Sequence, residues 1–182
     1  MRIWLGVDPG IKGAIAGVDD DGKLIDIREC PTLTMGKKRI TDEAGIGELL
    51  RKLNESLDVE IGKVGIEKVH AYPAIGLDNE PCPTCGGGRA ARGVVSTWTL
   101  AENFALWKGV CAGIPIPYEL LTPQRWRALL IRDTPPEATT KQASALIASR
   151  LWPRGAFGKR LTQDFAEAAL IAEATRRIFM GI

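Results

Sequence analysis

The chain has 182 residues, 45% of them hydrophobic and 25% charged, with a formal net charge of +2. A chain of this length can bury a core without disulfide or metal staples, so we expect a single domain spanning residues 1–182. No run approaches the roughly 18 apolar residues that suggest a membrane span, and the N-terminal residues lack the pattern of a cleavable signal peptide. We therefore expect a cytoplasmic protein with no membrane partner.

Three strands and a helix are expected in the first third of the chain. Apolar, β-prone residues at 2–8, 12–18 and 23–29 are separated by tight connections, which indicates an antiparallel meander. A loop through residues 35–38 follows. A helix then begins at Thr41, the expected N-cap, because acidic residues fill the first turn behind it. Its apolar residues recur at helical spacing: Ile46, Leu49, Leu50, Leu53 and Leu57.

The remaining expected elements alternate between strands and helices. Residues 63–69 form a fourth strand, which the helix crossover allows to lie parallel to the third. Residues 71–92, rich in Pro and Gly, are a loop insertion and not a second domain. Beyond them we expect a strand at 116–121 and helices at 97–112, 123–131, 139–151 and 162–179. This order is typical of an α/β fold of the ribonuclease H-like class, with a five-stranded mixed sheet flanked by helices.

Four carboxylates stand out by their positions in these elements. Asp8 ends the first strand, and Glu67 lies within the apolar fourth strand. Asp164 and Glu167 are three residues apart near the start of the last helix, a spacing that puts both on one helix face. A charged side chain in such surroundings is costly unless it is paired or binds a metal. If the first and fourth strands are neighbours and the last helix crosses them, the four carboxylates converge.

This convergence of like charges predicts a divalent metal site. Close carboxylates repel one another and raise each other's pKa values, and a cation relieves the repulsion. Oxygen ligands of this kind favour Mg²⁺ or Mn²⁺ over zinc. Two such ions about 3.5–4 Å apart activate a water and stabilise the leaving oxygen of a phosphodiester. Asp8 would bridge the ions, Glu67 and Glu167 would each favour one, and the remaining aspartate would complete the set.

Each carboxylate also has a purely structural explanation. Asp8 precedes Pro-Gly and fits a turn residue. Asp164, behind Thr162, fits compensation of the helix dipole. Glu67 has such an explanation only if its strand lies at the edge of the sheet. The joint placement of the four residues is what favours the metal site.

The segments that carry these residues resemble the RuvC-type Holliday-junction resolvases, especially the divergent versions of phages and mobile elements. The resemblance covers nearly the whole chain and rests on residues 6–18, 64–69, 102–127 and 162–172. It implies a Mg²⁺- or Mn²⁺-dependent crossover junction endodeoxyribonuclease, a homodimer that makes paired nicks in four-way junctions. The family's acidic quartet maps onto Asp8, Glu67, Asp164 and Glu167. Its last position is more often Asp in bacterial members, so a Glu here lengthens that ligand by one methylene.

Basic and aromatic residues are candidates for DNA contacts, because local basic groups neutralise phosphates even when the net charge is small. The candidates are Lys37, Lys38, Arg39, His70, Tyr72, Lys141, Lys159 and Arg160. Lys141 resembles a residue of the family's lysine-bearing helix, and His70 and Tyr72 follow the fourth strand, where the family often carries an aromatic residue that meets DNA. Solvated helix faces and partly buried rings are the respective alternatives. A further basic pair, Arg176 and Arg177, lies near the C-terminus.

The cysteines divide into two pairs. Cys30 and Cys111 fit buried positions, and four cysteines without a signal peptide argue against a disulfide framework. Cys82 and Cys85 form a CxxC followed by three glycines, which resembles half of a zinc knuckle. A second pair at similar spacing is missing from the sequence. The two alternatives are a structural zinc site and a flexible loop with two free thiols.

Two other classes of function fit parts of the sequence. One is a catalytically silent module of the same fold that binds DNA or a protein, although such a module has no physical need for all four carboxylates. The other is a nucleotide-binding domain of the actin and sugar-kinase type, whose opening turn resembles residues 8–10, but no second phosphate loop is found. The expected dimer interface is the helix at 97–112, with Trp98 and Trp107 on different faces. Complete burial of that helix inside the monomer is the alternative.

Overall fold

The structure, a computed structural model, describes residues 1–56, 60–69, 94–130, 140–157 and 161–182. Its main feature is a five-stranded sheet with the strand order β3-β2-β1-β6-β7. The strands are β1 (Arg2–Val7), β2 (Ala14–Asp19), β3 (Leu24–Glu29), β6 (Glu60–Glu67) and β7 (Tyr118–Leu121). The first three pair antiparallel, whereas β6 pairs parallel with both β1 and β7. The predicted meander and the mixed five-stranded sheet are therefore confirmed.

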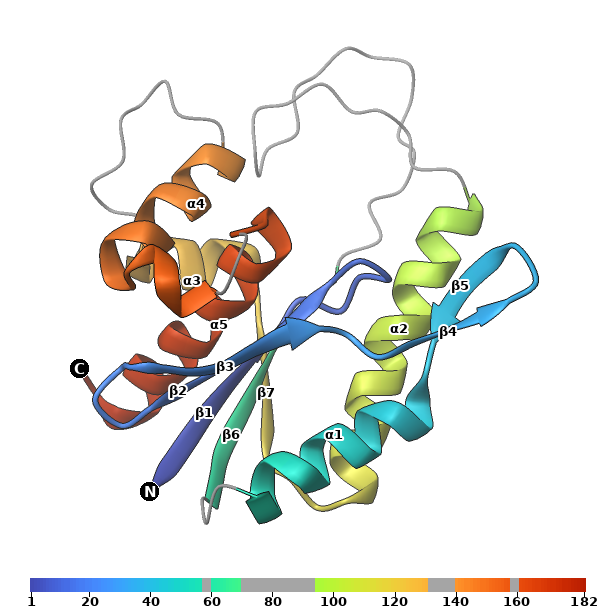
Figure 1. Cartoon of the computed structure of the whole chain (residues 1–182), viewed down its shortest axis with the longest axis horizontal. Coiled ribbons are helices and arrows are strands. Elements are labelled where there is room, and N and C mark those ends of the chain that lie inside the picture. Colours follow the sequence, from blue (N-terminus) through green and yellow to red (C-terminus); the bar gives the residue numbers. More distant parts are fainter. Residues whose placement is uncertain (57–59, 70–93, 131–139, 158–160) are drawn as a thin grey trace.

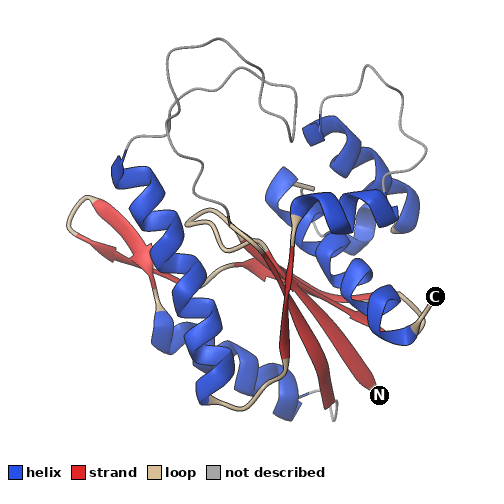
Figure 2. Cartoon of the chain, turned by 180° about the vertical axis from the view of Figure 1, so that it is seen from behind, coloured by secondary structure: helices blue, strands red, loops and turns tan. Residues whose placement is uncertain are grey.

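Helices cover both faces of this sheet (Figure 1, Figure 2). One face carries α1 (Glu43–Ser56) and α2 (Val94–Gly113). The other carries α3 (Pro123–Leu130), α4 (Thr140–Leu151) and α5 (Gln163–Met180), with a short 3-10 helix at Arg154–Phe157 before α5. The four helices after the insertion lie within three residues of their predicted bounds. No helix in the described part of the chain is both long enough and apolar enough to cross a membrane.

Two hydrophobic cores follow from the alternation of side chains along the central strands. In β1, Ile3, Leu5 and Val7 contribute to the core under α1 and α2. Trp4 points the opposite way and contributes to the core under α3, α4 and α5. Successive residues of a strand point to opposite faces, so a strand buried on both sides is apolar throughout. The continuous apolar character of the first strand in the sequence has this cause.

Two glycines let α5 lie directly on the sheet. A Cβ atom at Gly6 would overlap the backbone of Ala168 and Ala172, and one at Gly65 would overlap the hydroxyl of Thr175. Any side chain at Gly6 would therefore push the helix outward, because its neighbours there are backbone atoms that cannot turn aside. This close approach fixes the height of α5 above β1 and β6.

The segment between β3 and α1 differs from the prediction. Residues 35–38, expected as a loop, form the end of a hairpin made by β4 (Thr32–Met35) and β5 (Lys38–Thr41). Thr41 ends β5 and is not the N-cap of α1; that cap is Asp42, whose carboxylate accepts a hydrogen bond from the backbone N–H of Gly45 at 2.9 Å. Strands of four residues are too short to produce a clear periodicity in the sequence.

The other differences are smaller. The fourth predicted strand, β6, begins at Glu60 and ends at Glu67, and it pairs with β1 while running in the same direction as β3. Cys30 and Cys111 are buried, as predicted. In α2, Trp107 is fully buried but Trp98 is 72% exposed. The alternative in which this helix is completely buried inside the monomer is therefore wrong.

Candidate functional site

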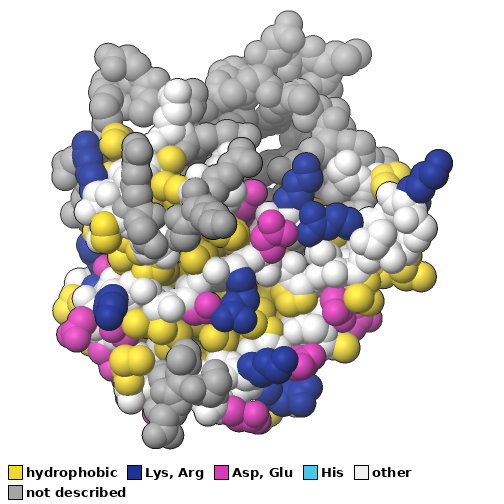
Figure 3. Space-filling view, viewed as in Figure 1, with side chains coloured by type: hydrophobic (Ala, Val, Ile, Leu, Met, Phe, Trp, Pro, Cys, Tyr) yellow, Lys and Arg dark blue, Asp and Glu magenta, His cyan; other side chains and the backbone are white. Residues whose placement is uncertain are grey.

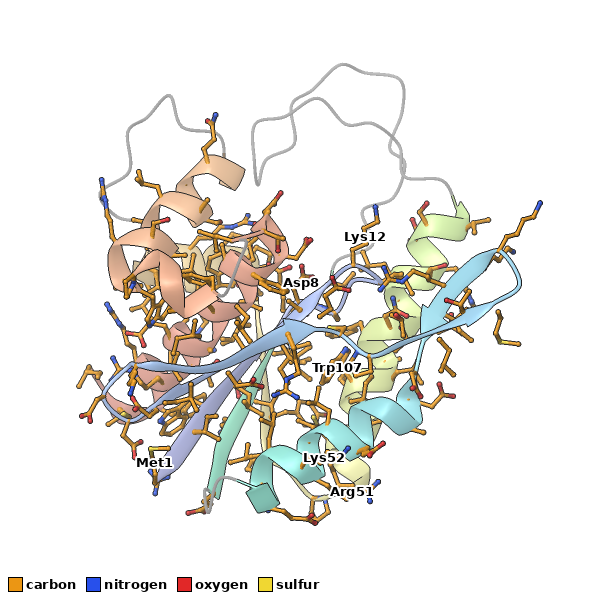
Figure 4. All side chains as sticks on the ribbon, viewed as in Figure 1. Met1, Asp8, Lys12, Arg51, Lys52 and Trp107 are labelled. Atoms are coloured by element: carbon orange, nitrogen blue, oxygen red, sulfur yellow. The ribbon has the colours of Figure 1, made fainter. Side chains whose placement is uncertain are left out.

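Asp8 and Glu67 lie side by side at the C-terminal ends of two neighbouring strands. β1 and β6 are parallel neighbours, with Val7 opposite Ile66. Asp8 and Glu67 are the residues that follow this pair along the two strands, so the register brings both to the same end of the sheet. Figure 4 shows Asp8 at this end. Since β6 lies between β1 and β7, Glu67 does not belong to an edge strand. The structural explanation that the sequence left open for Glu67 is therefore wrong.

The N-terminus of α5 brings two more carboxylates to this edge. Thr162 caps the helix, since its hydroxyl accepts a hydrogen bond from the backbone N–H of Phe165 at 3.2 Å. Asp164 follows in the first turn, a place that also suits the helix dipole. Glu167 comes one turn later and is only 9% exposed. The close packing of α5 on Gly6 holds these residues over the end of β1.

Burial and the neighbouring carboxylates raise the pKa of Asp8 to about 7. Burial is the largest cause, followed by the negative charges of Glu67 and Glu167, with a smaller effect of Asp164. The backbone N–H of Gly10, 3.3 Å from Oδ1 of Asp8, acts in the opposite direction. This turn-like hydrogen bond shows that Asp8 has a structural contact as well. The other three predicted carboxylates nevertheless all lie within electrostatic range of Asp8.

The indole of Trp126 orients Glu67. Trp126 is fully buried in α3, and its Nε1–H donates a hydrogen bond to Oε1 of Glu67 at 3.1 Å. A hydrogen bond to a carboxylate restricts its rotation and so fixes its orientation. The parallel strands β6 and β7 end at the same edge, with Glu67 opposite Leu121 in register. The helix that follows β7 therefore starts beside Glu67.

Glu167 is surrounded by donors from three helices. Its Oε1 lies 3.2 Å from the side-chain nitrogen of Gln163 and 3.5 Å from the hydroxyl of Ser144. The guanidinium of Arg127 lies 3.7 Å from the same oxygen and 4.9 Å from the centre of the Trp126 ring. The Nε atom of Arg127 is buried without a hydrogen-bond partner among the described residues. A partly buried cation thus stands at the rim of the carboxylate group.

The donor set suits a hard divalent cation, because it consists of carboxylate oxygens. The nearby thiol of Cys30 donates a hydrogen bond to the backbone oxygen of Asp8 at 3.4 Å. Within the described residues, however, no three carboxylate, imidazole or thiol groups stand close enough to hold a metal ion. Protein donors already engage Glu67 and Glu167. Metal binding would therefore require a change in the side-chain torsions of the carboxylates.

The predicted DNA-contact residues are dispersed. Lys37, Lys38 and Arg39 lie on the β4–β5 hairpin, and Lys141 belongs to α4, although its side chain is not described. Outside the described residues lie the insertion and the following side chains: His70, Tyr72, Cys82, Cys85, Lys159 and Arg160.

The C-terminal basic pair is structural. Arg176 is 9% exposed, and Nε and Nη2 of its guanidinium each bond to one carboxylate oxygen of Glu173 at 2.8 Å. Arg177 bonds to the same carboxylate at 2.7 Å. These arginines are therefore engaged within the fold, and neither a phosphate contact nor a solvated face describes Arg176.

Three residues near the site were not among the site residues predicted from the sequence, although Arg127 and Arg125 form one of the basic pairs that the sequence contains. Trp126 and Arg127 contact the carboxylates, and Lys12 is exposed in the turn that follows Asp8. Figure 4 shows Lys12 at the same edge of the sheet as Asp8, and Figure 3 shows basic and acidic side chains next to each other on this face. No local signal in the sequence marks Trp126, because its contact with Glu67 depends on the pairing of β6 with β7.

The fold is similar to that of RuvC from Thermus thermophilus. The structure of T. thermophilus RuvC in complex with Holliday junction substrate superposes with a TM-score of 0.61 at 13% sequence identity, covering 100% of this chain and 97% of that chain. A second T. thermophilus RuvC structure gives a TM-score of 0.60 at 15% identity, covering 98% and 96%. No family model and no curated protein matches the sequence. The predicted RuvC-like ribonuclease H fold is confirmed, and similarity at this level of identity concerns the fold alone.

Proposed function

We propose that this chain is a Mg²⁺- or Mn²⁺-dependent endonuclease that nicks branched DNA, with the four-way junction as its substrate. The observation that carries the proposal is the gathering of Asp8, Glu67, Asp164 and Glu167 at the ends of two parallel strands. Four acidic side chains repel one another there, and a divalent cation relieves that repulsion. The junction is proposed because T. thermophilus RuvC, which has a similar fold, was solved in complex with Holliday junction substrate.

The proposed roles follow from the contacts of each residue. Asp8 is the central ligand, because the charges of the other three carboxylates all act on it. Bound divalent ions would supply positive charge against the phosphate and activate water for hydrolysis. Trp126 keeps Glu67 in position through its indole N–H. Arg127, a cation at the rim beside Glu167, is placed to attract a phosphate group.

A homodimer is the proposed assembly, since paired nicks in a two-fold junction call for two sites. The outer face of α2 is the proposed interface. A shallow groove there is lined mainly by apolar and small side chains, among them Trp98, Ala101, Ala105 and Leu106. An exposed Trp beside small residues suits an interface, because aromatic residues supply large contact areas.

Cleavage assays on synthetic DNA test the proposal. The protein is incubated with four-way, three-way and linear duplexes in Mg²⁺, Mn²⁺ or a chelator, and we expect symmetric nicks on the four-way form in metal only. Asp8→Asn should abolish cleavage and retain junction binding. Arg51→Ala with Lys52→Ala, a change on α1 at the opposite edge of the sheet, is the control and should cleave normally (Figure 4).

Other results would assign the chain to another class. Equal cutting of every branched form would indicate a broader debranching nuclease. Junction binding without cleavage in either metal would indicate a silent binding module. Cleavage that persists in Asp8→Asn would contradict the assignment of the site. Measurement of ATP binding on the same protein tests the actin-like alternative.

A further inference from the structure

The β4–β5 hairpin stands apart from the main sheet and has two chemically different faces. Its register pairs Leu33 with Ile40 and Met35 with Lys38, so these side chains share one face. The remaining residues of the two strands form the opposite, polar face, on which Arg39 donates hydrogen bonds to the hydroxyl of Thr32. Within the described residues, the two strands pair only with each other.

The apolar face of the hairpin is open. Leu33 is 49% exposed, Met35 64% and Ile40 36%. A two-stranded hairpin that buries no apolar face is at best marginally stable in water. Three exposed apolar side chains on such a small element therefore indicate a surface that packs against something else.

The positive charge of the hairpin indicates which kind of partner it binds. Residues 32–41 contain three basic residues and no acidic one. Lys37 and Lys38 are exposed at the turn, whereas Arg39 forms an ion pair with Glu29 at 3.4 Å. Figure 3 shows basic and hydrophobic side chains together on this projecting element. Two such hairpins packed together in a dimer would bring like charges close to one another. A nucleic acid complements the hairpin better, because its phosphates match the basic residues and the faces of its bases match the apolar side chains.

The root of the hairpin is attached to the turn that carries Asp8. Cys30, between β3 and β4, donates its backbone N–H to the carbonyl of Gly13 at 2.9 Å and its thiol to the carbonyl of Asp8 at 3.4 Å. Asp42 closes the other end by donating its N–H to the carbonyl of Pro31 at 3.0 Å. Lys12 is exposed in the same turn and lies at the same end of the sheet as Asp8 (Figure 4). The root of the hairpin is therefore hydrogen-bonded to the turn that carries Asp8 and exposes Lys12.

We infer that the β4–β5 hairpin is a second DNA-binding surface that engages an arm of the branched substrate. Lys37 and Lys38 bind backbone phosphates. The side chains of Leu33, Met35 and Ile40 cover bases or sugars exposed at the branch point, as apolar side chains do when they pack against unstacked bases. This inference rests on the proposed function, since it assumes that branched DNA is the substrate.

A pair of charge-matched variants tests the basic tip. Fluorescence anisotropy measures binding of a labelled four-way junction without divalent metal, so that no cleavage occurs. Lys37→Ala with Lys38→Ala should weaken binding about tenfold at physiological salt and lower the slope of log K against log salt by about 2, since each phosphate contact contributes about 0.9. Arg51→Ala with Lys52→Ala removes the same charge at the opposite edge and should leave both values within twofold of wild type.

A second variant tests the apolar face. Leu33→Ser with Met35→Ser changes exposed side chains and should leave the melting temperature nearly unchanged. It should reduce by at least half the fluorescence change of 2-aminopurine placed at the branch point, while a linear duplex is bound as before. An unchanged 2-aminopurine signal would overturn the inference, as would equal losses in the two charge variants. Sedimentation shows whether Leu33→Ser with Met35→Ser dissociates a dimer. Dissociation would mean that the apolar face of the hairpin contacts a second copy of the chain, and it would also overturn the inference. Wild-type protein that binds no junction would overturn the proposed function as well.

Discussion

Asp8 is the residue at which several unfavourable effects add up. Burial disfavours its ionised form, and the three other carboxylates act in the same direction, so its pKa rises from 3.8 to about 7. In the unfolded chain the carboxyl returns to its ordinary pKa. Folding therefore binds a proton to Asp8 between about pH 4 and pH 7.

The sign of this shift predicts how stability depends on pH. A raised pKa in the folded state means that the contribution of Asp8 is fully present below about pH 4 and is lost as the pH rises through about 7. Asp8→Asn cannot ionise, so in chelator at pH 8 it should be more stable than wild type by on the order of 2 kcal/mol. At pH 4 the two proteins should differ much less. Thermal unfolding at both pH values measures this, and adding Mg²⁺ at pH 8 should stabilise only wild type.

Trp126 acts on the site through Glu67. Trp126→Phe keeps an aromatic ring and removes the indole N–H that holds Oε1 of Glu67. Loss of such an outer partner typically costs 10- to 100-fold in metal affinity, so Mn²⁺ titration by calorimetry should show a drop of at least about tenfold. Trp152→Phe is the matched control, because that buried indole donates to the carbonyl of Gly22 instead. Equal Mn²⁺ affinities in the two variants would show that the hydrogen bond has no positioning role.

The carboxylates themselves were predictable from the sequence, and their partners were not. Asp8 and Glu67 stand out because charged residues are rare beside apolar strands, which is a local property of the sequence. Trp126 and Arg127 are ordinary members of an amphipathic helix until the helix is placed. Their roles depend on which strand ends lie beside one another, and no local pattern carries that information.

At the scale of elements, the contact between α5 and the sheet decides whether the site exists. The helix carries Asp164 and Glu167, and the strands carry the other two carboxylates. Their separation depends on how closely α5 approaches β1, and Gly6 permits that approach. An outward shift of the helix would move both of its carboxylates away from Asp8 and Glu67.

Gly6→Ala should therefore damage both stability and the site. The new methyl group would overlap the backbone of Ala168 and Ala172, so the free energy of unfolding should fall by about 2 kcal/mol or more. Gly47→Ala is the control, because a Cβ in that part of α1 meets only Val110 at an ordinary 3.8 Å. Replacing glycine within a helix should stabilise by roughly 0.5–1 kcal/mol. Urea denaturation measures both changes, and a loss in neither variant would contradict the role given to Gly6.

The hairpin was missed at the same scale for a physical reason. Leu33 and Ile40 alternate with polar residues, as strands do, but over four residues the pattern does not differ from that of a loop. The prediction of Thr41 as the N-cap was wrong for the same reason, since Thr41 is the last residue of β5 and Asp42 accepts the capping hydrogen bond. Both residues are good caps by type, and the register of the hairpin chose between them.

At the scale of the whole molecule, the exposed face of α2 carries the proposed assembly. Trp98→Glu places a charge in the groove beside Ala101 and Leu106 and should convert the dimer to monomers. Sedimentation measures the change, and the paired nicks of a junction should become uncoordinated. Leu146→Glu on α4, 37% exposed on the other face of the sheet, is the control and should leave the dimer intact. A monomeric wild-type protein, or a dimer that survives Trp98→Glu, would contradict the proposed interface.

The sequence by itself determined the order of the α-helices and of the five strands of the main sheet, the apolar character of the central strands and the four carboxylates that break apolar patterns. These features depend on the period of side chains along the chain and on neighbouring residues, and both can be read locally. Only the tertiary structure decided that β6 lies beside β1, that α5 rests on Gly6 and Gly65, and that Trp126 bonds to Glu67. Each of these contacts joins residues that are far apart in the chain. The contacts form because both apolar faces of the sheet must be buried, and packing the helices against these faces restricts where each helix can lie.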